Sequence, residues 1–207
     1  ATLEISPRKV ARRYDVCITG RTFKEIAESP EVVQKRSDKL KLLGAGLHIK
    51  DYTGSLCSVS DLRAYLERIY SKGFKFDLLI VDHSDLLYSA TKYHEKRHEL
   101  SSIVSGLRRI GAEFGVPVWT ASQATRKAGA TGATTLWDIA EDIGKANWAD
   151  LAITISQKEG EKDDSIAWLQ IAKTRLGKGN PKFLVSIDYD TMTMKGTKEH
   201  DPYSKKS

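Results

Sequence analysis

Two carboxylates stand directly after segments that are predicted to be strands, where they could act on a bound phosphate. Asp82 follows the unbroken aliphatic run at residues 78–81, a pattern typical of a parallel strand covered on both faces. Magnesium in nucleotide hydrolases is held by one or two protein carboxylates and by phosphate oxygens, so Asp82 is a candidate magnesium-associated carboxylate that binds the ion through water. Glu4 ends a strand predicted to lie beside that of Asp82, where it could position and deprotonate the water that attacks a terminal phosphate. Taken singly, Asp82 could equally start a turn, and Glu4 is better explained as an exposed residue near a chain end.

An amide and two cations follow later predicted strands. Gln123 offers both a donor and an acceptor, so it could sense a phosphate oxygen or a water. Lys173 and Arg175 alternate with Thr174 and are predicted to point to one face, where two cations could stabilise charge that develops during phosphoryl transfer. In isolation Gln123 is equally a turn residue, and two cations are more often a solvated strand end. Ligands of open parallel sheets bind beyond the carboxyl ends of the strands, so the whole set is predicted to converge at one edge.

The elements that would position these residues alternate between helices and strands. Apolar spacing and terminal signals predict helices over residues 7–20, 23–29, 31–43, 61–71 and 97–114. Strands are predicted at residues 1–5 (as the tail of a longer strand), 47–50, 78–81, 116–121, 151–156, 166–172 and 183–187, with a polar hairpin-like turn at 158–164 and a Gly/Ala/Thr-rich loop at 125–135. No linker or repeat divides the chain, which predicts one α/β domain over residues 1–207 with a mainly parallel sheet.

The composition is that of an ordinary globular protein with a modest basic bias. Hydrophobic residues make up 40% and charged residues 29%, and no apolar run approaches the length needed to cross a bilayer. The net charge of +6 and the pI of about 9.2 suit a polyanionic partner such as nucleic acid, but many other proteins share them. Only two cysteines occur, Cys17 and Cys57, which are expected to be small buried residues of a protein in a reducing, cytoplasmic compartment.

In order and approximate spacing, the motifs resemble those of DnaB-type hexameric replicative helicases, and the resemblance covers nearly the whole chain. Residues 2–6, Thr-Leu-Glu-Ile-Ser, resemble the Ser-Leu-Glu-Met-Ser segment that carries the family's catalytic glutamate, and residues 79–82 resemble its Walker B strand. Residues 100–126 are similar to its helix, its Val-Pro-Val strand and its Ser-Gln-x-x-Arg motif, and residues 136–152 to its Asp-Leu-Arg…Ala-Asp stretch. Residues 171–179 resemble its Ala-Lys-Gln-Arg-x-Gly segment, whose Lys and Arg reach the ATP of the neighbouring subunit.

This resemblance implies a RecA-like P-loop ATPase fold and a motor function. The expected activity is ATP- and Mg²⁺-dependent unwinding of DNA by a homo-hexameric ring that moves 5′→3′ on single-stranded DNA, with a primase or helicase loader as a further partner and no membrane. Its place would be the cytoplasm of a bacterium or of a phage-infected host. By resemblance the catalytic residues are Glu4, Asp82 and Gln123, with Asp82 toward magnesium, and the trans-acting pair is Lys173 and Arg175.

The chain departs from the family pattern in three places. The Gly-x-x-x-x-Gly-Lys-[Ser/Thr] phosphate loop, which lies upstream of the glutamate in the family, is absent, as is the helical domain that binds primase. Without that loop the 207-residue chain is not expected to hydrolyse ATP well by itself. After Asp82 stand His83, Ser84 and Asp85, where family members usually carry Tyr-Leu-Gln, so these three residues are assigned no role.

Two basic segments are expected to face single-stranded DNA by the same resemblance. The first follows Asp82 and includes Lys92, Lys96 and Arg97; the second follows Gln123 and includes Arg126 and Lys127. Basic side chains on flexible segments suit binding to the backbone without regard to base sequence, although solvated surface loops would look alike. Two alternatives remain for the chain as a whole: a RecA/RadA-like recombinase or KaiC-like ATPase, and a non-catalytic remnant that binds only DNA or a partner.

Overall fold

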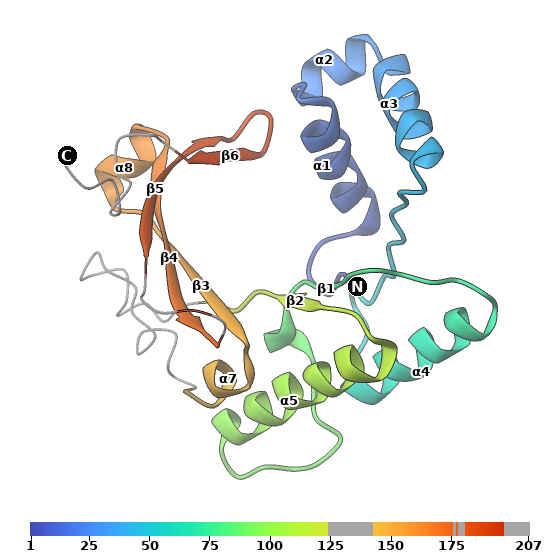
Figure 1. Cartoon of the computed structure of the whole chain (residues 1–207), viewed down its shortest axis with the longest axis vertical. Helices are drawn as coiled ribbons and strands as arrows, with labels where there is room; N and C mark the ends of the chain where they lie inside the picture. The colour runs from blue at the N-terminus through green and yellow to red at the C-terminus, as the bar shows by residue number, and fades with distance from the viewer. Residues whose placement is uncertain (124–142, 176, 178–180, 197–207) are drawn as a thin grey trace.

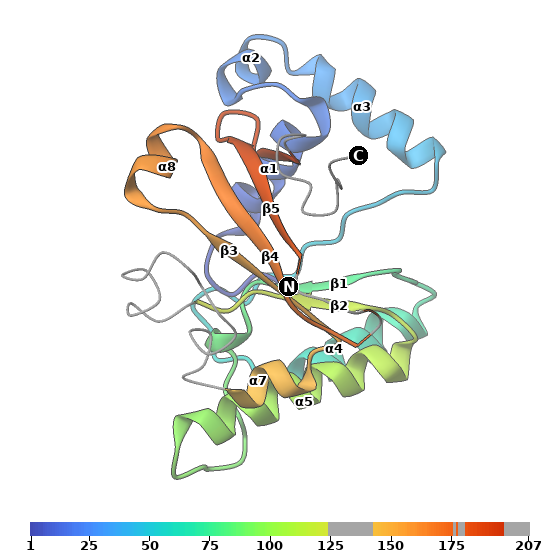
Figure 2. The ribbon, with the colours of Figure 1, turned by 60° about the vertical axis from the view of Figure 1, so that its left-hand side comes forward.

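The computed structural model describes residues 1–123, 143–175, 177 and 181–196, which form three groups of elements (Figure 1). A helical arm contains α1 (Pro7–Thr19), α2 (Phe23–Glu28) and α3 (Glu31–Leu42). A parallel layer contains β1 (Leu79–Val81) and β2 (Val118–Thr120), which lie against α4 (Val59–Ser71) and α5 (Lys96–Phe114), with the short 3-10 helix η1 (Ser84–Leu86) between β1 and α5. An antiparallel sheet contains β3 (Leu151–Ser156), β4 (Ile166–Thr174), β5 (Lys182–Asp188) and β6 (Thr193–Gly196), with α8 (Glu159–Asp163) beside it. Helix α7 (Ile143–Trp148), which precedes β3, lies against α5 (Figure 2).

The parallel layer is built around the first residues of the chain. Thr2 forms parallel bridges to both Asp51 and Asp82, so the start of the chain lies between these two segments. On the other side β1 pairs in parallel with β2, from Leu79 opposite Val118 to Val81 opposite Thr120. The strand predicted at 47–50 does not form as such. Only its end meets the layer, where the amide N–H of Thr2 donates to the carbonyl of Lys50 and Thr2 forms a bridge to Asp51.

The sheet is partly antiparallel, which corrects the expectation of a mainly parallel sheet. Strands β3, β4, β5 and β6 follow one another in space as they do in sequence, and each pairing among them is antiparallel. Short connections impose this arrangement, since parallel neighbours need a long crossover whereas antiparallel neighbours do not. One such connection, expected as a turn at 158–164, contains the five-residue helix α8. The loop expected at 125–135 lies outside the described residues.

The core of the parallel layer is made by α4 and α5. The apolar faces of the two helices bury Leu62 and Leu66 of α4, and Ile103, Leu107 and Ile110 of α5, together with Leu79 and Val81 of β1. Both helices end or begin with recognisable signals: Ser58 and Asp61 form a reciprocal capping box before α4, and Gly115 closes α5 with a φ of 66°. None of the described helices is long and apolar enough to span a membrane.

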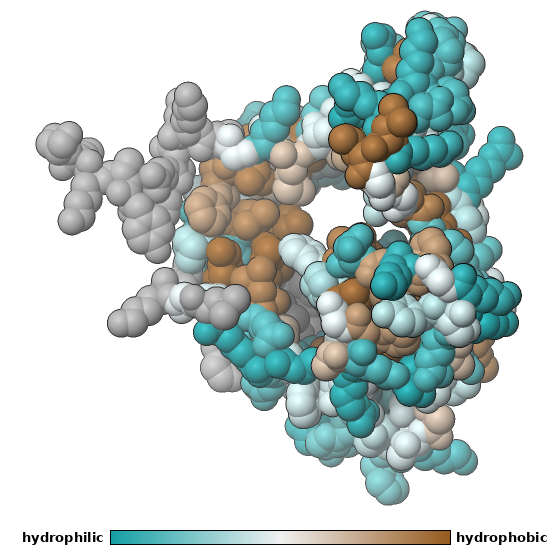
Figure 3. Space-filling view, turned by 45° about the vertical axis from the view of Figure 1, so that its right-hand side comes forward, coloured by the Kyte–Doolittle hydropathy of each residue, from teal (hydrophilic) through white to brown (hydrophobic). Residues whose placement is uncertain are grey.

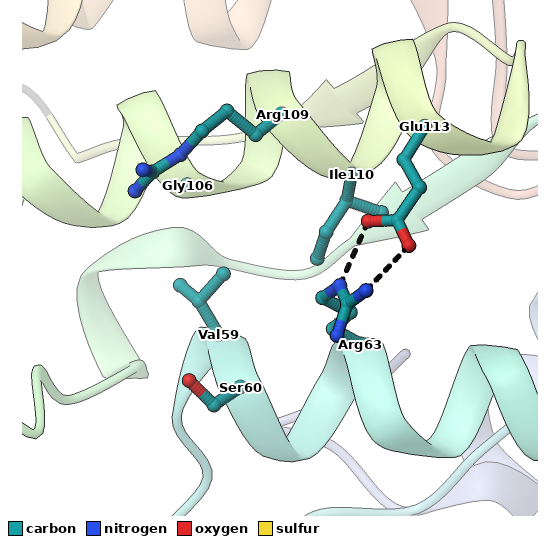
Figure 4. Close-up of a pocket in the computed structure, with 7 residues that line it drawn as sticks. All are labelled: Val59, Ser60, Arg63, Gly106, Arg109, Ile110 and Glu113. Carbon is teal, nitrogen blue, oxygen red and sulfur yellow. Dashed lines mark hydrogen bonds and ion pairs between the residues drawn. The ribbon is translucent and has the colours of Figure 1, made fainter.

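Figure 4 shows how closely α4 and α5 approach on the side away from the strands. The approach depends on Gly106, where a Cβ atom would lie 2.9 Å from Val59 Cγ1. Further along, Arg63 donates two hydrogen bonds to Glu113, at 2.8 and 2.7 Å, and the groove between them is lined also by Ser60, Arg109 and Ile110. This groove contains none of the residues that the sequence predicts for chemistry.

The helical arm buries little of its own surface. Val16 is its only buried residue among those described, and Leu42 and Leu43 at the end of α3 are 88% and 74% exposed. Helix α1 ends at Gly20 with a φ of 65°, as predicted. Ser6 is the residue before its first turn, and the Ser6 side chain makes no capping hydrogen bond. Cys17 is exposed and only Cys57 is buried, so the expectation of two buried cysteines is half wrong; burial raises the pKa of Cys57 to about 11.

Apolar side chains remain exposed along the strands. In β1 Ile80 is 41% exposed between two buried neighbours, in β2 Trp119 is 54% exposed, and in β3 Ile153 and Ile155 are 36% and 56% exposed. Figure 3 shows apolar surface gathered around the antiparallel sheet. The expectation that residues 78–81 would be covered on both faces is therefore wrong for the described chain. Among the described pairings, β2 pairs only with β1, and β3 only with β4.

Candidate active site

The first two predicted carboxylates lie on neighbouring chain segments. The amide N–H of Leu3 donates to the carbonyl of Asp82 at 2.9 Å, and the amide N–H of Asp82 donates to the carbonyl of Ala1 at 3.0 Å. Glu4 and Asp82 therefore leave the parallel layer side by side at the carboxyl edge of the strands. The side chain of Glu4 is 55% exposed and that of Asp82 is partly exposed, so both are accessible to a ligand at this edge.

His83 and Asp85, to which the sequence assigned no role, continue from this pair. The ring of His83 is buried, with its Nε2 atom 3.7 Å from Oε2 of Glu4 and its Nδ1 atom 3.9 Å from Oδ2 of Asp85. Both distances are too long for hydrogen bonds, and Nδ1 is a buried polar atom with no hydrogen-bond partner among the described residues. His83 thus lies between two carboxylates, with each ring nitrogen facing one of them.

Gln123 contacts the carboxylate of Asp85 through its backbone. Its amide N–H donates to Oδ2 of Asp85 at 3.4 Å, and the hydroxyl of Ser122 donates to the same oxygen at 3.0 Å. The amide N–H of Ser84 donates to the hydroxyl oxygen of Thr120 at 3.0 Å, which ties the segment after β1 to the end of β2. Gln123 is exposed, so its side-chain amide is accessible to a ligand at this edge.

Lys145 of α7 is a cation held in place at this edge by its contacts with Asp85 and Ser122. Its ammonium donates to Oδ1 of Asp85 at 2.5 Å and to the hydroxyl oxygen of Ser122 at 3.0 Å, and its side chain is only 11% exposed. Lys145 was not predicted from the sequence, because it is 60 positions from Asp85 and is not one of the motif residues that define the family-like stretch at 136–152. The departure from the family pattern at residues 83–85 was the available signal that the edge contains an additional polar contact.

Lys173 and Arg175 lie together, but they contact the other end of α7. Lys173 donates to the carbonyl oxygens of Ala146 and Asn147 at 2.6 and 3.1 Å, and Arg175 donates to that of Asn147 at 2.9 Å. Arg175 also pairs with Asp150 at 3.1 Å. Burial lowers the pKa of Lys173, and the positive charge of Arg175 lowers it further. The two cations share a face as predicted, yet no described hydrogen bond or ion pair joins them to the carboxylates or amide of the edge.

The described part of the basic segments is exposed and partly neutralised. Lys92 is exposed, Lys96 pairs with Glu99 at 2.8 Å, and Arg97 pairs with Glu95 at 2.6 Å. Arg126 and Lys127 lie outside the described residues, so their expected place on the second DNA-facing segment stays a prediction.

The carboxylates at this edge fit magnesium better than a metal held by protein alone. Among the described residues no group of three or more His, Cys, Asp or Glu side chains is placed to hold a metal ion. Magnesium keeps several waters and takes only one or two carboxylates plus phosphate oxygens, which is what a partly exposed Asp82 with Glu4 beside it can offer. Asp82 also forms no ion pair with a Lys or Arg side chain in the described chain, so its charge is available to a cation.

The fold and this edge together define an α/β protein with the RecA-like ATPase architecture. A structure described as a DnaB-like replicative helicase and its interactions with primase is similar, with a TM-score of 0.75 and 18% identity over 93% of this chain and 48% of that chain. A second similar structure, described as an ATPase domain, has a TM-score of 0.73 and 18% identity over 93% of this chain and 72% of that one. The chain thus spans about half the length of the first of these proteins. No match is found among curated proteins.

The sequence itself carries the family assignment. The family model for the DnaB-like helicase C terminal domain matches residues 3–195, so the chain belongs to that family. The resemblance noted from the motifs is confirmed, and with it the RecA-like fold class.

Proposed function

We propose that the chain is the motor part of a replicative helicase, in which residues 1–207 act as a single RecA-like ATPase domain. The observation that carries this proposal is the convergence of Glu4, Asp82 and the Gln123 segment at one edge of the parallel layer, bridged by His83 and Asp85. This is the edge at which open α/β sheets bind ligands. Membership of the DnaB-like family supports the same interpretation.

Each side chain has one task in the proposed hydrolysis of ATP. Bound Mg²⁺ would supply a counter-charge for the phosphates, and Asp82 would orient it through water. Glu4 accepts the proton of the water that attacks the terminal phosphate, while the exposed amide of Gln123 contacts a phosphate oxygen or that water. The phosphate-binding loop is expected upstream of Glu4, so the full-length protein is the proposed enzyme.

Lys173 and Arg175 are proposed to act across a subunit boundary. Two cations at one strand end can stabilise negative charge in the transition state of a neighbouring ATP. Their carbonyl contacts on α7 support this, because those contacts hold both side chains together and leave the charge of Lys173 without an acidic partner in the described chain, while Arg175 also pairs with Asp150. The proposed assembly is a homo-hexameric ring that moves 5′→3′ on single-stranded DNA, with a primase or loader as a further partner.

DNA binding is proposed for the two basic segments, with Lys92, Lys96 and Arg97 in the first and Arg126 and Lys127 in the second. The exposure of Lys92 supports this for the first segment. Contacts to backbone phosphates would make affinity independent of base sequence and strongly dependent on salt.

The decisive test is Glu4→Gln in the full-length protein. The substitution keeps the size of the side chain but removes the base, so we expect single-strand-stimulated ATPase activity to fall by roughly 10²-fold or more while ATP binding is retained. The matched control is Glu28→Gln at the exposed end of α2, which should leave the rate unchanged. Normal hydrolysis by Glu4→Gln would refute the proposed site. Unwinding of forks with a 5′ but not a 3′ single-stranded tail tests the direction, and the mass of the assembly tests the ring.

A further inference from the structure

We propose that Lys145 is a positioning residue for this active site, acting through Asp85 on His83 and Glu4. The proposal rests on the function proposed above and extends it to Lys145, a residue that lies within the family-like stretch at 136–152 but was assigned no role from the sequence. Its basis is a line of contacts from the ammonium of Lys145 to the carboxylate of Glu4, in which Asp85 and His83 are the intermediate members.

The first step is the ion pair at the base of the line. The Lys145 side chain is 11% exposed and that of Asp85 is 21% exposed, and the ammonium lies 2.5 Å from Oδ1 of the carboxylate. A poorly solvated ion pair is retained at little net cost only when its geometry is good and its other polar atoms are satisfied. Here Ser122 meets both partners, since its hydroxyl donates to Asp85 and accepts from Lys145. Asp85 is therefore held from two sides.

The second step is the fixing of Lys145 itself by α7. A helix of six residues is marginal in isolation, so its position has to come from outside. The carbonyl oxygens of its last residues accept hydrogen bonds from three cations, which is favourable at a helix C-terminus. These donors and acceptors are Lys173 with Ala146 and Asn147, Arg175 with Asn147, and Arg108 with Trp148 at 2.7 Å. Lys145 thus projects from a helix whose C-terminal end is held in place by these hydrogen bonds.

The third step is the contact of Asp85 with the groups beside the proposed catalytic residues. Oδ2 of Asp85 accepts from the backbone N–H of Gln123 and lies 3.9 Å from Nδ1 of His83, whose other ring nitrogen lies 3.7 Å from Glu4. Nδ1 of His83 lacks a hydrogen-bond partner among the described residues, so Asp85 is the acceptor placed to meet it after a shift of about 1 Å. If the Lys145 charge is removed, Asp85 keeps only the hydrogen bonds from Ser122 and Gln123, so its carboxylate is held less firmly beside His83. The position of His83 relative to Glu4 then becomes less well defined.

A merely structural role for Lys145 makes a different prediction. An ion pair that only attaches α7 would lower the free energy of unfolding when it is broken, and the folded fraction would still hydrolyse ATP at the normal rate. A positioning role predicts instead a lower kcat in fully folded enzyme with little change in the KM for ATP, because Lys145 lies behind Asp85 and is itself shielded from solvent. Misplacement of a catalytic group by about 1 Å can cost roughly 10²-fold in rate.

The experiment compares variants of the full-length protein by single-strand-stimulated ATPase assay, at a temperature where thermal unfolding shows each variant to be folded. Lys145→Met keeps the aliphatic stem and removes the charge, and we expect kcat to fall at least about tenfold with KM for ATP within about twofold. Lys145→Arg should restore most of the rate. Asp85→Asn should show the same loss, and the double variant should be no slower than either single variant, because both act on one line. Lys162→Met on α8, an exposed lysine without an ion pair among the described residues, is the matched control.

Glu4→Gln is measured in parallel so that the two proposals can be separated. If Glu4→Gln is inactive while folded Lys145→Met keeps the wild-type kcat, the positioning role is overturned and the proposed function stands. Additive losses in the double variant, or a change in KM alone, overturn it equally. If Lys145→Met does not fold, Asp85→Asn decides: wild-type kcat in that variant rejects the proposal. If Glu4→Gln hydrolyses ATP normally, the proposed function fails and the role of Lys145 fails with it.

Discussion

Replacement of Gly111 by alanine tests how tightly α5 is seated against the strand that leads to Gln123. A Cβ atom at this position would lie 2.9 Å from the carbonyl oxygen of Val116 and 3.0 Å from Cγ2 of Val118. The first contact is with backbone, which cannot swing aside as the end of a side chain can. The backbone around Gly111 is also held in place by hydrogen bonds, because the carbonyl of Gly111 accepts from the amides of Gly115 and Val116.

Two opposing effects set the size of the change. Overpacking of a well-packed interior costs about 1–3 kcal/mol. Alanine is favoured over glycine within a helix by about 1 kcal/mol, which offsets part of that cost. For Gly111→Ala we therefore expect a net loss of roughly 1 kcal/mol in the free energy of unfolding, the balance of overpacking and propensity. The strand β2 should shift with Val118, and the ATPase rate of the full-length protein should fall because Gln123 follows that strand.

The assay is urea denaturation of the full-length protein, in parallel with the same substitution at Gly160. A Cβ atom at Gly160 meets nothing within 4 Å and the residue lies in α8, so Gly160→Ala should be neutral or stabilise by up to about 1 kcal/mol through helix propensity alone. Opposite signs at the two sites are the expected outcome. If Gly111→Ala stabilises the protein as much as Gly160→Ala does, the argument from close packing is wrong.

Three further predictions concern a helix cap and the DNA-facing segment. Ser58→Ala removes the hydroxyl that accepts from the Asp61 amide at 3.1 Å, and should lower the free energy of unfolding by about 1 kcal/mol in the same denaturation assay. The pKa of Asp61 is lowered by hydrogen bonds from the Ser58 hydroxyl and then from its backbone N–H, so its stabilising effect is present above the ordinary aspartate pKa of 3.8 and is lost as the pH falls below it. Asp61→Asn should therefore flatten the acid limb of the stability curve, and an unchanged limb would contradict the assignment. Lys92→Ala in the full-length protein should weaken binding to single-stranded DNA equally for all sequences and reduce the salt slope by about one counterion; a slope equal to that of wild type would remove Lys92 from the interface.

Local signals in the sequence were sufficient for much of the fold. Glycine is the residue that most readily adopts the left-handed conformation at a helix end, and Gly20 and Gly115 both have it. The aliphatic run before Asp82 and the spacing of the apolar residues in α5 likewise depend on neighbours within a few positions, which a single sequence displays directly. The location of Glu4 beside Asp82 followed from the rule that strand ends of a parallel layer meet at one edge.

Contacts between residues far apart in the chain could not be predicted from the sequence. The contact of Lys145 with Asp85 joins residues 60 positions apart and depends on where α7 is carried by the chain. Strand direction is similarly set by the length of connections in three dimensions, so the antiparallel order of β3 to β6 was not visible in the apolar runs themselves. The contacts of Lys173 and Arg175 away from the carboxylate edge follow from the same cause, because their partner is the end of α7.

The two incompletely paired strands have a practical consequence for handling the protein. Along β2 and β3 the described backbone leaves a row of donors and acceptors without a ladder partner on one side, next to the exposed rings and branches of Trp119, Ile153 and Ile155. Exposed edge strands of this kind readily pair with further strands, including strands from other molecules. Preparations of residues 1–207 alone should consequently self-associate with rising concentration, and a charged residue placed at position 155 should keep them dispersed.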